Sequence, residues 1–161
     1  YYIPISYHSV IDNYKYIKKI NKVLWLGNIL NRREVYLSKL ISLNNIIDVY
    51  TNNIWGIEKQ QLLSKYKIYI DISMFEPNYS SVNMFKFQYG FINRCLIITE
   101  YINDIYIYEQ LKEFVIFVKT PNEMIEKINY YLDIKNENEL NIKTHNAYEW
   151  FTNTSFRNYL Q

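Results

Sequence analysis

The chain has 161 residues, of which 49% are hydrophobic and 18% are aromatic, and this composition excludes an intrinsically disordered protein. Its 18 basic and 16 acidic residues are interspersed and leave a formal charge of only +2, so no nucleic-acid partner is expected. No apolar run is long enough to span a bilayer, and the length suits one domain with a substantial core.

Residue usage and the single cysteine bear on the source and the compartment of the protein. Tyr, Ile, Asn and Lys are abundant and Ala147 is the only alanine, a bias that the A+T-rich codons of a low-GC genome produce. Cys95 has no partner for an intramolecular disulfide and lies in an apolar run, where a small buried side chain is expected. No cleavable signal peptide is evident, so we expect a reducing, cytoplasmic location.

Short β-type runs alternate with helical patterns along the first two thirds of the chain. In chain order we expect a strand over 22–27, a helix over 30–43, a strand over 46–51, a helix over 57–65, a strand over 66–72, a helix over 80–92 and a strand over 94–99. Ser80 and Ser81 are the candidate caps of the helix that ends at Ile92.

The last third begins with a strand over 114–119 and a well-marked helix start. Thr120 is the expected N-cap, Pro121 lies in the first turn, and Glu123 completes a capping box. This helix should run to about Asp133, and the polar segment 135–141 is either a break or a new helix start. A final helix should carry the apolar side chains of Tyr148, Trp150, Phe151, Phe156 and Leu160.

Five strands that alternate with helices predict a Rossmann-like α/β fold, in which helices cover both faces of a parallel five-stranded sheet. Ligands of such sheets bind beyond the carboxyl ends of the strands, near the point where the strand order reverses. The candidate binding loops are therefore 27–30, 52–56, 73–79 and 100–104. We assign 1–21 to a lead-in segment and 22–161 to the domain itself.

The segment 22–33, KVLWLGNILNRR, is the most informative stretch. A buried strand that turns at Gly27 into a helix beginning with Arg32 and Arg33 can hold phosphate, because a helix N-terminus attracts anions and arginine binds them through paired hydrogen bonds. The alternative is an ordinary turn with both arginines on a solvated helix face. Neither a G-x-G-x-x-G fingerprint nor a phosphate-binding P-loop motif occurs in the chain.

The order of motifs resembles the C-terminal half of GT-B glycosyltransferases, with the nearest likeness to CgeB-like and related group 1 enzymes. The motifs are LWLG at 24–27, the arginine pair at 32–33, GIE at 56–58, IDI at 70–72, RCLIITE at 94–100, EMIEKINYYL at 123–132 and YEWFTNTSFRNYL at 148–160. The resemblance implies that this half binds a nucleotide diphosphate sugar without a metal or other cofactor. It also implies a separate half or partner that binds the acceptor.

The resemblance further implies which residues contact the donor. Gly27, Asn28 and Arg33 would lie near the diphosphate, and Glu100 would face the sugar or ribose. Gln88 stands where the family has Glu, and an amide cannot accept two charge-assisted bonds or act as a base. The expected substrate-binding residues are Gly27, Asn28, Arg32, Arg33, Lys86, Gln88 and Glu100, and no catalytic residue is assigned.

Further departures and weak candidates limit the assignment of a reaction. Asp71-Ile-Ser73 replaces the Asn-Ile-His that relatives often have. His8 and His145 are not expected to be catalytic, and the loop acids Glu76 and Asp104 are expected to be solvated.

Three hypotheses from different classes remain. The first is the donor-binding domain of a glycosyltransferase, in which Arg33→Ala weakens nucleotide binding. The second is a degenerate, non-catalytic domain of the same fold that acts as a structural or interaction protein. The third is a flavodoxin-like or receiver-like binding module. If a companion half packs against this domain, we expect an exposed aromatic patch, with 101–108 (YINDIYIY) as the place to look.

Overall fold

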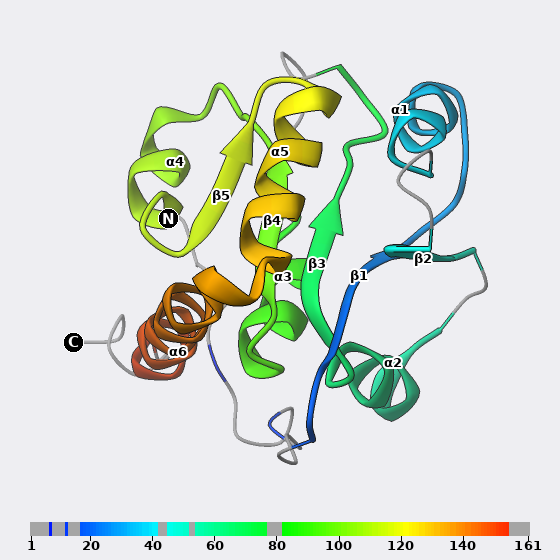
Figure 1. Ribbon diagram of the computed structural model, residues 1–161. Helices are drawn as coiled ribbons and strands as arrows, with labels where there is room; N and C mark the ends of the chain where they lie inside the picture. The colour runs from blue at the N-terminus through cyan, green and yellow to red at the C-terminus, as the bar shows by residue number, and fades with distance from the viewer. Residues whose placement is uncertain are drawn as a thin grey trace.

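The computed structural model describes residues 7, 12, 17–41, 45–51, 54–76 and 82–154. Its core is a five-stranded parallel sheet with the order β2-β1-β3-β4-β5, as Figure 1 shows. The strands are β1 (Ile20–Leu26), β2 (Ile47–Tyr50), β3 (Tyr66–Asp71), β4 (Leu96–Glu100) and β5 (Val115–Val118). The predicted Rossmann-like α/β fold is confirmed.

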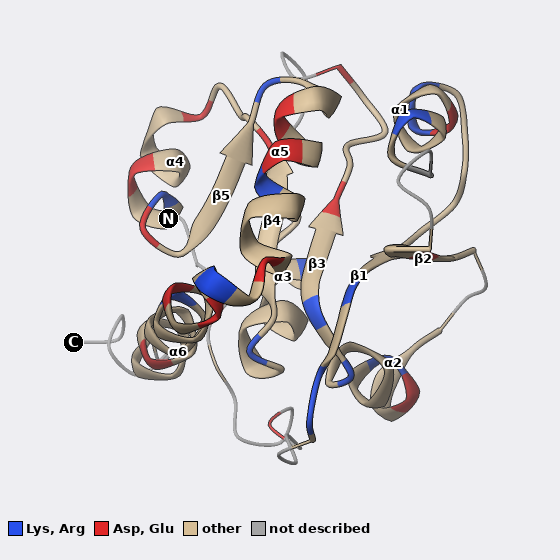
Figure 2. Cartoon of the chain, in the orientation of Figure 1, with Lys and Arg blue, Asp and Glu red and all other residues tan. Residues whose placement is uncertain are grey.

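Helices connect successive strands and cover both faces of the sheet. They are α1 (Arg32–Ile41), α2 (Gly56–Leu63), α3 (Met84–Ile92), α4 (Ile105–Leu111), α5 (Pro121–Leu132) and α6 (Glu137–Asn153), with a short 3-10 turn, η3 (Ile134–Asn136), between the last two. Figure 2 shows their acidic and basic residues spread over many elements. No helix within the described ranges is both long and apolar enough to cross a membrane.

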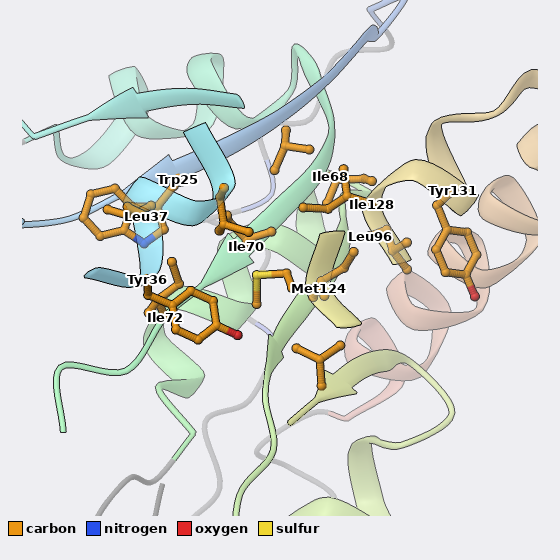
Figure 3. Close-up of a cluster of buried hydrophobic side chains, with 14 of the residues drawn as sticks. Trp25, Tyr36, Leu37, Ile68, Ile70, Ile72, Leu96, Met124, Ile128 and Tyr131 are labelled. Atoms are coloured by element: carbon orange, nitrogen blue, oxygen red, sulfur yellow. The ribbon is translucent and has the colours of Figure 1, made fainter. Parts of the chain in front are cut away.

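One face of the sheet packs against α1 and α5. Side chains alternate along a strand, so Ile68 and Ile70 of β3 point to this face and meet Leu37 of α1 and Met124 of α5 (Figure 3). Trp25 of β1 is fully buried in the same cluster. These large apolar side chains hold both helices against the sheet.

The other face packs against α2 and α3. The fit of α3 against the sheet is close at Gly90, because a Cβ there would lie 2.8 Å from Cδ1 of Ile97. The last helix passes from one face to the other: Leu140 of α6 joins the first cluster, whereas Ala147 and Phe151 pack with Phe91 of α3.

The helix boundaries confirm some sequence predictions and correct others. The hydroxyl of Thr120 caps α5 by accepting from the N–H of Glu123 at 3.1 Å, and the Glu123 carboxylate accepts from Lys119 N–H, one residue before the bond that a capping box predicts. The cap of α3 is Asn83, whose side chain accepts from Lys86 N–H. The prediction of a serine cap is therefore wrong, and both serines lie outside the described residues.

One helix was absent from the sequence prediction, and another begins earlier than predicted. The helix α4 was not expected; Asp104 caps it, accepting from Ile107 N–H at 3.1 Å. The final helix begins at Glu137, so the polar segment is a helix start and His145 lies within α6 and not at its beginning. Phe156 and Leu160, assigned to this helix, lie outside the described residues.

Tyr7 and Asp12 contact the last part of α6. The N–H of Tyr7 donates to the carbonyl of Thr154 at 3.2 Å, and the hydroxyls of Tyr7 and Tyr148 both donate to the Asp12 carboxylate, at 3.0 and 2.9 Å. Burial and the Asp12 carboxylate raise the pKa of Tyr7 to about 12. The lead-in predicted for 1–21 overlaps the sheet, since β1 begins at Ile20.

Candidate functional site

The strand order reverses between β1 and β3, because β1 leads through α1 to β2 on one side while β3 lies on the other. The carboxyl ends of β1 and β3 therefore flank the crevice where ligands of such sheets bind. Gly27 follows β1 directly and donates its N–H to Tyr50 O at 3.1 Å. A Cβ at Gly27 would lie 3.1 Å from the Trp25 ring and 3.6 Å from Nη1 of Arg33, so a larger residue would require the Trp25 ring to shift slightly.

Arg33 spans this crevice with hydrogen bonds to both sides of it. Its Nε donates to Ile72 O, just after β3, at 2.9 Å, and its Nη1 donates to Asn28 O, just after β1, at 3.4 Å. The guanidinium also lies 5.9 Å from the centre of the Trp25 ring. Nη2 has no hydrogen-bond acceptor among the described residues, so the positive group keeps a donor for a ligand.

The N-terminus of α1 is less open than the sequence suggests. The helix begins at Arg32 after a loop, and Asn31 before it has a left-handed φ of +49°. The N–H groups of Arg33 and Glu34 donate to the carbonyls of Leu30 and Asn31, both at 3.1 Å. Because these amides are already bonded, an anion here would depend mainly on the arginine side chain.

Arg32 and Glu100 were both predicted to contact the donor, and the structure pairs them with each other. The guanidinium of Arg32 donates to both carboxylate oxygens of Glu100, to Oε2 at 2.8 Å, and Ser73 N–H donates to the same Oε2 at 2.8 Å. Hydrogen bonding to Glu100 raises the pKa of Arg32, although burial opposes the shift. Arg32 also contacts the exposed Glu76, 3.6 Å away. Neither arginine therefore lies on a freely solvated helix face.

A second charged group lies at the end of β3, on the face that α2 and α3 cover. Nζ of Lys86 donates to Oδ1 of Asp71 at 2.6 Å, and both side chains are largely buried. Nζ of Lys59, from α2, lies 4.3 Å from the centre of the Tyr89 ring of α3. Gln88 lies two positions after Lys86 on α3, and residues two apart on a helix point about 200° from each other. The structure thus separates Gln88 from the lysine that was predicted to share its site.

Sequence reasoning missed Lys59 and the role of Asp71. The signal for Asp71 was present, because an acidic residue that closes an apolar strand at the ligand edge needs a partner. Lys59 carries no such signal, since its importance depends on α2 and α3 lying side by side. Burial lowers the pKa of Lys59 to about 8, and the neighbouring Lys86 ammonium adds to this effect.

Other candidate features lie elsewhere. A pocket of about 430 Å³ lies by α2 at the amino ends of the strands, lined in part by Gln60, Ser64 and Asn93. His145 is exposed on α6, and His8 falls outside the described residues. No group of three or more metal-ligating side chains occurs in the described part of the chain.

Comparison with known proteins identifies the fold. No protein-family model and no curated protein sequence matches the chain. Among solved structures it is similar to an α1,3-fucosyltransferase crystal structure, with a TM-score of 0.55 and 14% sequence identity over 89% of this chain. The chain has the fold of one half of a GT-B glycosyltransferase. It spans 44% of the length of the fucosyltransferase chain.

This likeness bears on the competing folds. The strand order 2-1-3-4-5 also occurs in flavodoxin-like proteins, so the order alone does not separate them from the GT-B half. A receiver-like module needs clustered acids after the first strand, and here Gly27 and Asn28 follow β1. The likeness to the fucosyltransferase structure therefore supports a GT-B half as the fold of the chain.

Proposed function

We propose that the chain is the donor-binding half of a CgeB-like or group 1 glycosyltransferase and binds a nucleotide diphosphate sugar in the crevice between β1 and β3. The observation that carries this proposal is the position of Arg33, whose guanidinium lies between the carbonyls that follow the two strands. A cation at the strand-order reversal of a parallel sheet is suited to a diphosphate. The GT-B-like fold supports the same conclusion.

The proposed chemistry is transfer of a sugar to an acceptor hydroxyl. The bond between the anomeric carbon and the diphosphate oxygen breaks, the acceptor oxygen bonds to that carbon, and the acceptor proton passes to a base. Negative charge grows on the departing nucleoside diphosphate, where Arg33 would stabilise it. We assign the base to the companion half and propose a reaction that needs no metal, in the cytoplasm.

The carboxyl edge of the sheet supports the proposal of a companion half. Large apolar side chains are exposed near the starts of α3 and α4 and in the loop after β3. They are Phe85, Ile105 and Phe75, and Phe85 is the most exposed of them, at 67%. Apolar residues that gather at a ligand edge are typical of a surface that packs against another domain.

The predicted aromatic patch over 101–108 is present only in part. Ile105 and Tyr106 are exposed, whereas Ile102 is buried. The Tyr108 ring packs between those of Tyr101 and Phe117, with ring centres 5.2 and 5.1 Å away. Only the outer side of α4 thus adds to the apolar edge.

The degenerate, non-catalytic alternative also has an observation in its favour. Arg32 and Glu100 satisfy each other, so neither charge is left unpaired when no ligand is bound. If they are structural, the donor site relies on Arg33 and on the lysines near Asp71. Nucleotide binding therefore separates the two hypotheses.

Calorimetric titration of the 161-residue chain with UDP, GDP and their sugar conjugates tests the proposal. We expect saturable binding of one nucleotide, weakened about tenfold or more in Arg33→Gln, because a charge-assisted contact to phosphate is lost. Lys127→Gln, which removes an exposed positive charge from α5, is the matched control and should bind normally. Thermal unfolding verifies that Arg33→Gln remains folded. Failure of every nucleotide to bind the folded wild-type chain would contradict the proposal and make the degenerate alternative the leading hypothesis.

A further inference from the structure

The charged group at the end of β3 has more positive than negative charge. Lys86 is paired with Asp71 at 2.6 Å, and both side chains are largely shielded, with 19% and 11% of their surface exposed. Lys59 is half-buried nearby against the Tyr89 ring, and no described carboxylate lies within ion-pair distance of its ammonium. Of the two ammonium groups, Asp71 thus contacts only that of Lys86, although its charge also acts on Lys59.

This arrangement is unfavourable without a further anion. Burial and the Lys86 ammonium lower the pKa of Lys59 to about 8, while Asp71 opposes the shift. Both lysines also lie close to the N-termini of their helices, Lys59 in the fourth position of α2 and Lys86 in the third position of α3. Positive side chains are disfavoured there because the helix dipole is positive at that end. A bound anion would relieve both kinds of repulsion.

An unsatisfied hydroxyl lies on the same face of β3. Tyr69 is two residues before Asp71, so the two side chains point to the same side of the sheet. Tyr69 is fully buried, and its hydroxyl has no hydrogen-bond partner among the described residues. Burial raises its pKa, and Asp71 adds to the shift, so the hydroxyl keeps its proton and remains a donor. Buried polar groups are normally paired, so this hydroxyl is a buried donor without its usual acceptor, on the face of β3 that also carries Asp71.

We propose that Lys59 and Lys86 form a binding site for a phosphate-class oxyanion beside Asp71, on the face of the sheet opposite to Arg32 and Glu100. The chemistry fits either inorganic phosphate or the phosphate of a nucleotide. If the anion is a phosphate of the nucleotide, the inference rests on the proposed function, and the two lysines are a second group of cations in the donor site. If the anion is inorganic phosphate, the inference is independent of the proposed function.

The titration of Lys59 followed by NMR in a chain labelled at lysine Cε tests the site directly. The Lys59 resonance is assigned from its loss in Lys59→Arg, and the pKa is measured at constant ionic strength without addition, with phosphate and with pyrophosphate. We expect pyrophosphate to raise the pKa of Lys59 from about 8 towards its ordinary value of 10.5. An unchanged titration at saturating pyrophosphate and phosphate overturns the proposal.

Calorimetry supplies the matched comparison. Pyrophosphate affinity should fall about tenfold or more in Lys59→Met, through loss of a charge-assisted contact, and stay near that of wild type in Lys59→Arg and in Lys127→Met. Thermal unfolding checks the fold of each variant. Equal pyrophosphate affinity in wild type and folded Lys59→Met overturns the site.

Nucleotide titrations separate this proposal from the proposed function. If Lys59→Met and Arg33→Gln both weaken nucleotide binding, the site holds a phosphate of the nucleotide. If pyrophosphate binds through Lys59 while no nucleotide binds, the anion site stands and the donor-binding function falls. If a nucleotide binds, and Lys59→Met changes neither the nucleotide affinity nor the pyrophosphate affinity, the proposed function stands and the anion site is refuted.

Discussion

Replacement of Arg32 by leucine should destabilise the fold strongly, because it leaves the Glu100 carboxylate buried without its cation. The Glu100 side chain is only 5% exposed, and Arg32 is its bidentate partner. After the substitution, the N–H of Ser73 is the remaining donor to that carboxylate among the described residues. Removal of one partner from a buried ion pair costs about 3–5 kcal/mol. Since 21% of the Arg32 side chain is exposed and water can partly replace it, we expect about 3 kcal/mol.

Urea unfolding at pH 7 measures this loss in Arg32→Leu, Glu100→Leu and the double variant. The double variant should be more stable than the sum of the single losses predicts, because it contains no unpaired buried charge. Lys22→Met is the control: Lys22 and Asp48 form a more exposed pair at 2.9 Å, with 37% and 29% of the side chains exposed. Such a pair is worth about 0.2–1 kcal/mol.

A loss below about 1 kcal/mol in Arg32→Leu, or strict additivity in the double variant, would refute a structural role for the pair. If nucleotide binding were then lost in Arg32→Leu, the pair would belong to the ligand site. A large loss of stability with strong coupling would instead show that the fold requires these two residues whether or not a ligand binds.

Two further predictions concern packing and pH. Gly90→Ala should lower the free energy of unfolding in urea by about 1–3 kcal/mol, because its Cβ would lie 2.8 and 2.9 Å from Cδ1 and Cγ1 of the buried Ile97. An unchanged free energy of unfolding would mean that α3 can shift away from β4. Lys59→Met should alter the pH dependence of stability. Folded wild type binds fewer protons at Lys59 than the unfolded chain between pH 8 and 10.5, so its free energy of unfolding rises with pH across that window. Because Lys59 is partly exposed, we expect that rise relative to Lys59→Met to be about 1 kcal/mol, and parallel curves for the two proteins would contradict it.

Local signals in the sequence predicted most of the regular elements. The apolar runs that became β3 and β4 are buried on both faces, as expected for central parallel strands, and the Thr120-Pro121 start of α5 was found at its exact position. The helix α4 was missed because YINDIYIY is rich in Tyr and Ile, which favour strands. Asp104, as its N-cap, was the one local sign of a helix there.

The sequence by itself determined the class of fold and the edge of the sheet at which a ligand site would lie, because periodicity and turn residues act over a few positions. It also singled out Arg32, Arg33, Lys86 and Glu100 as charged residues at that edge. Only the tertiary structure decided their partners. Arg32 and Glu100 are 68 residues apart, and their pairing depends on how the start of α1 lies relative to the end of β4. The charges of Lys86 and Asp71 act on Lys59 because α2 and α3 cover the same face of the sheet. The balance of charge there is therefore set by contacts between elements and not by any local pattern.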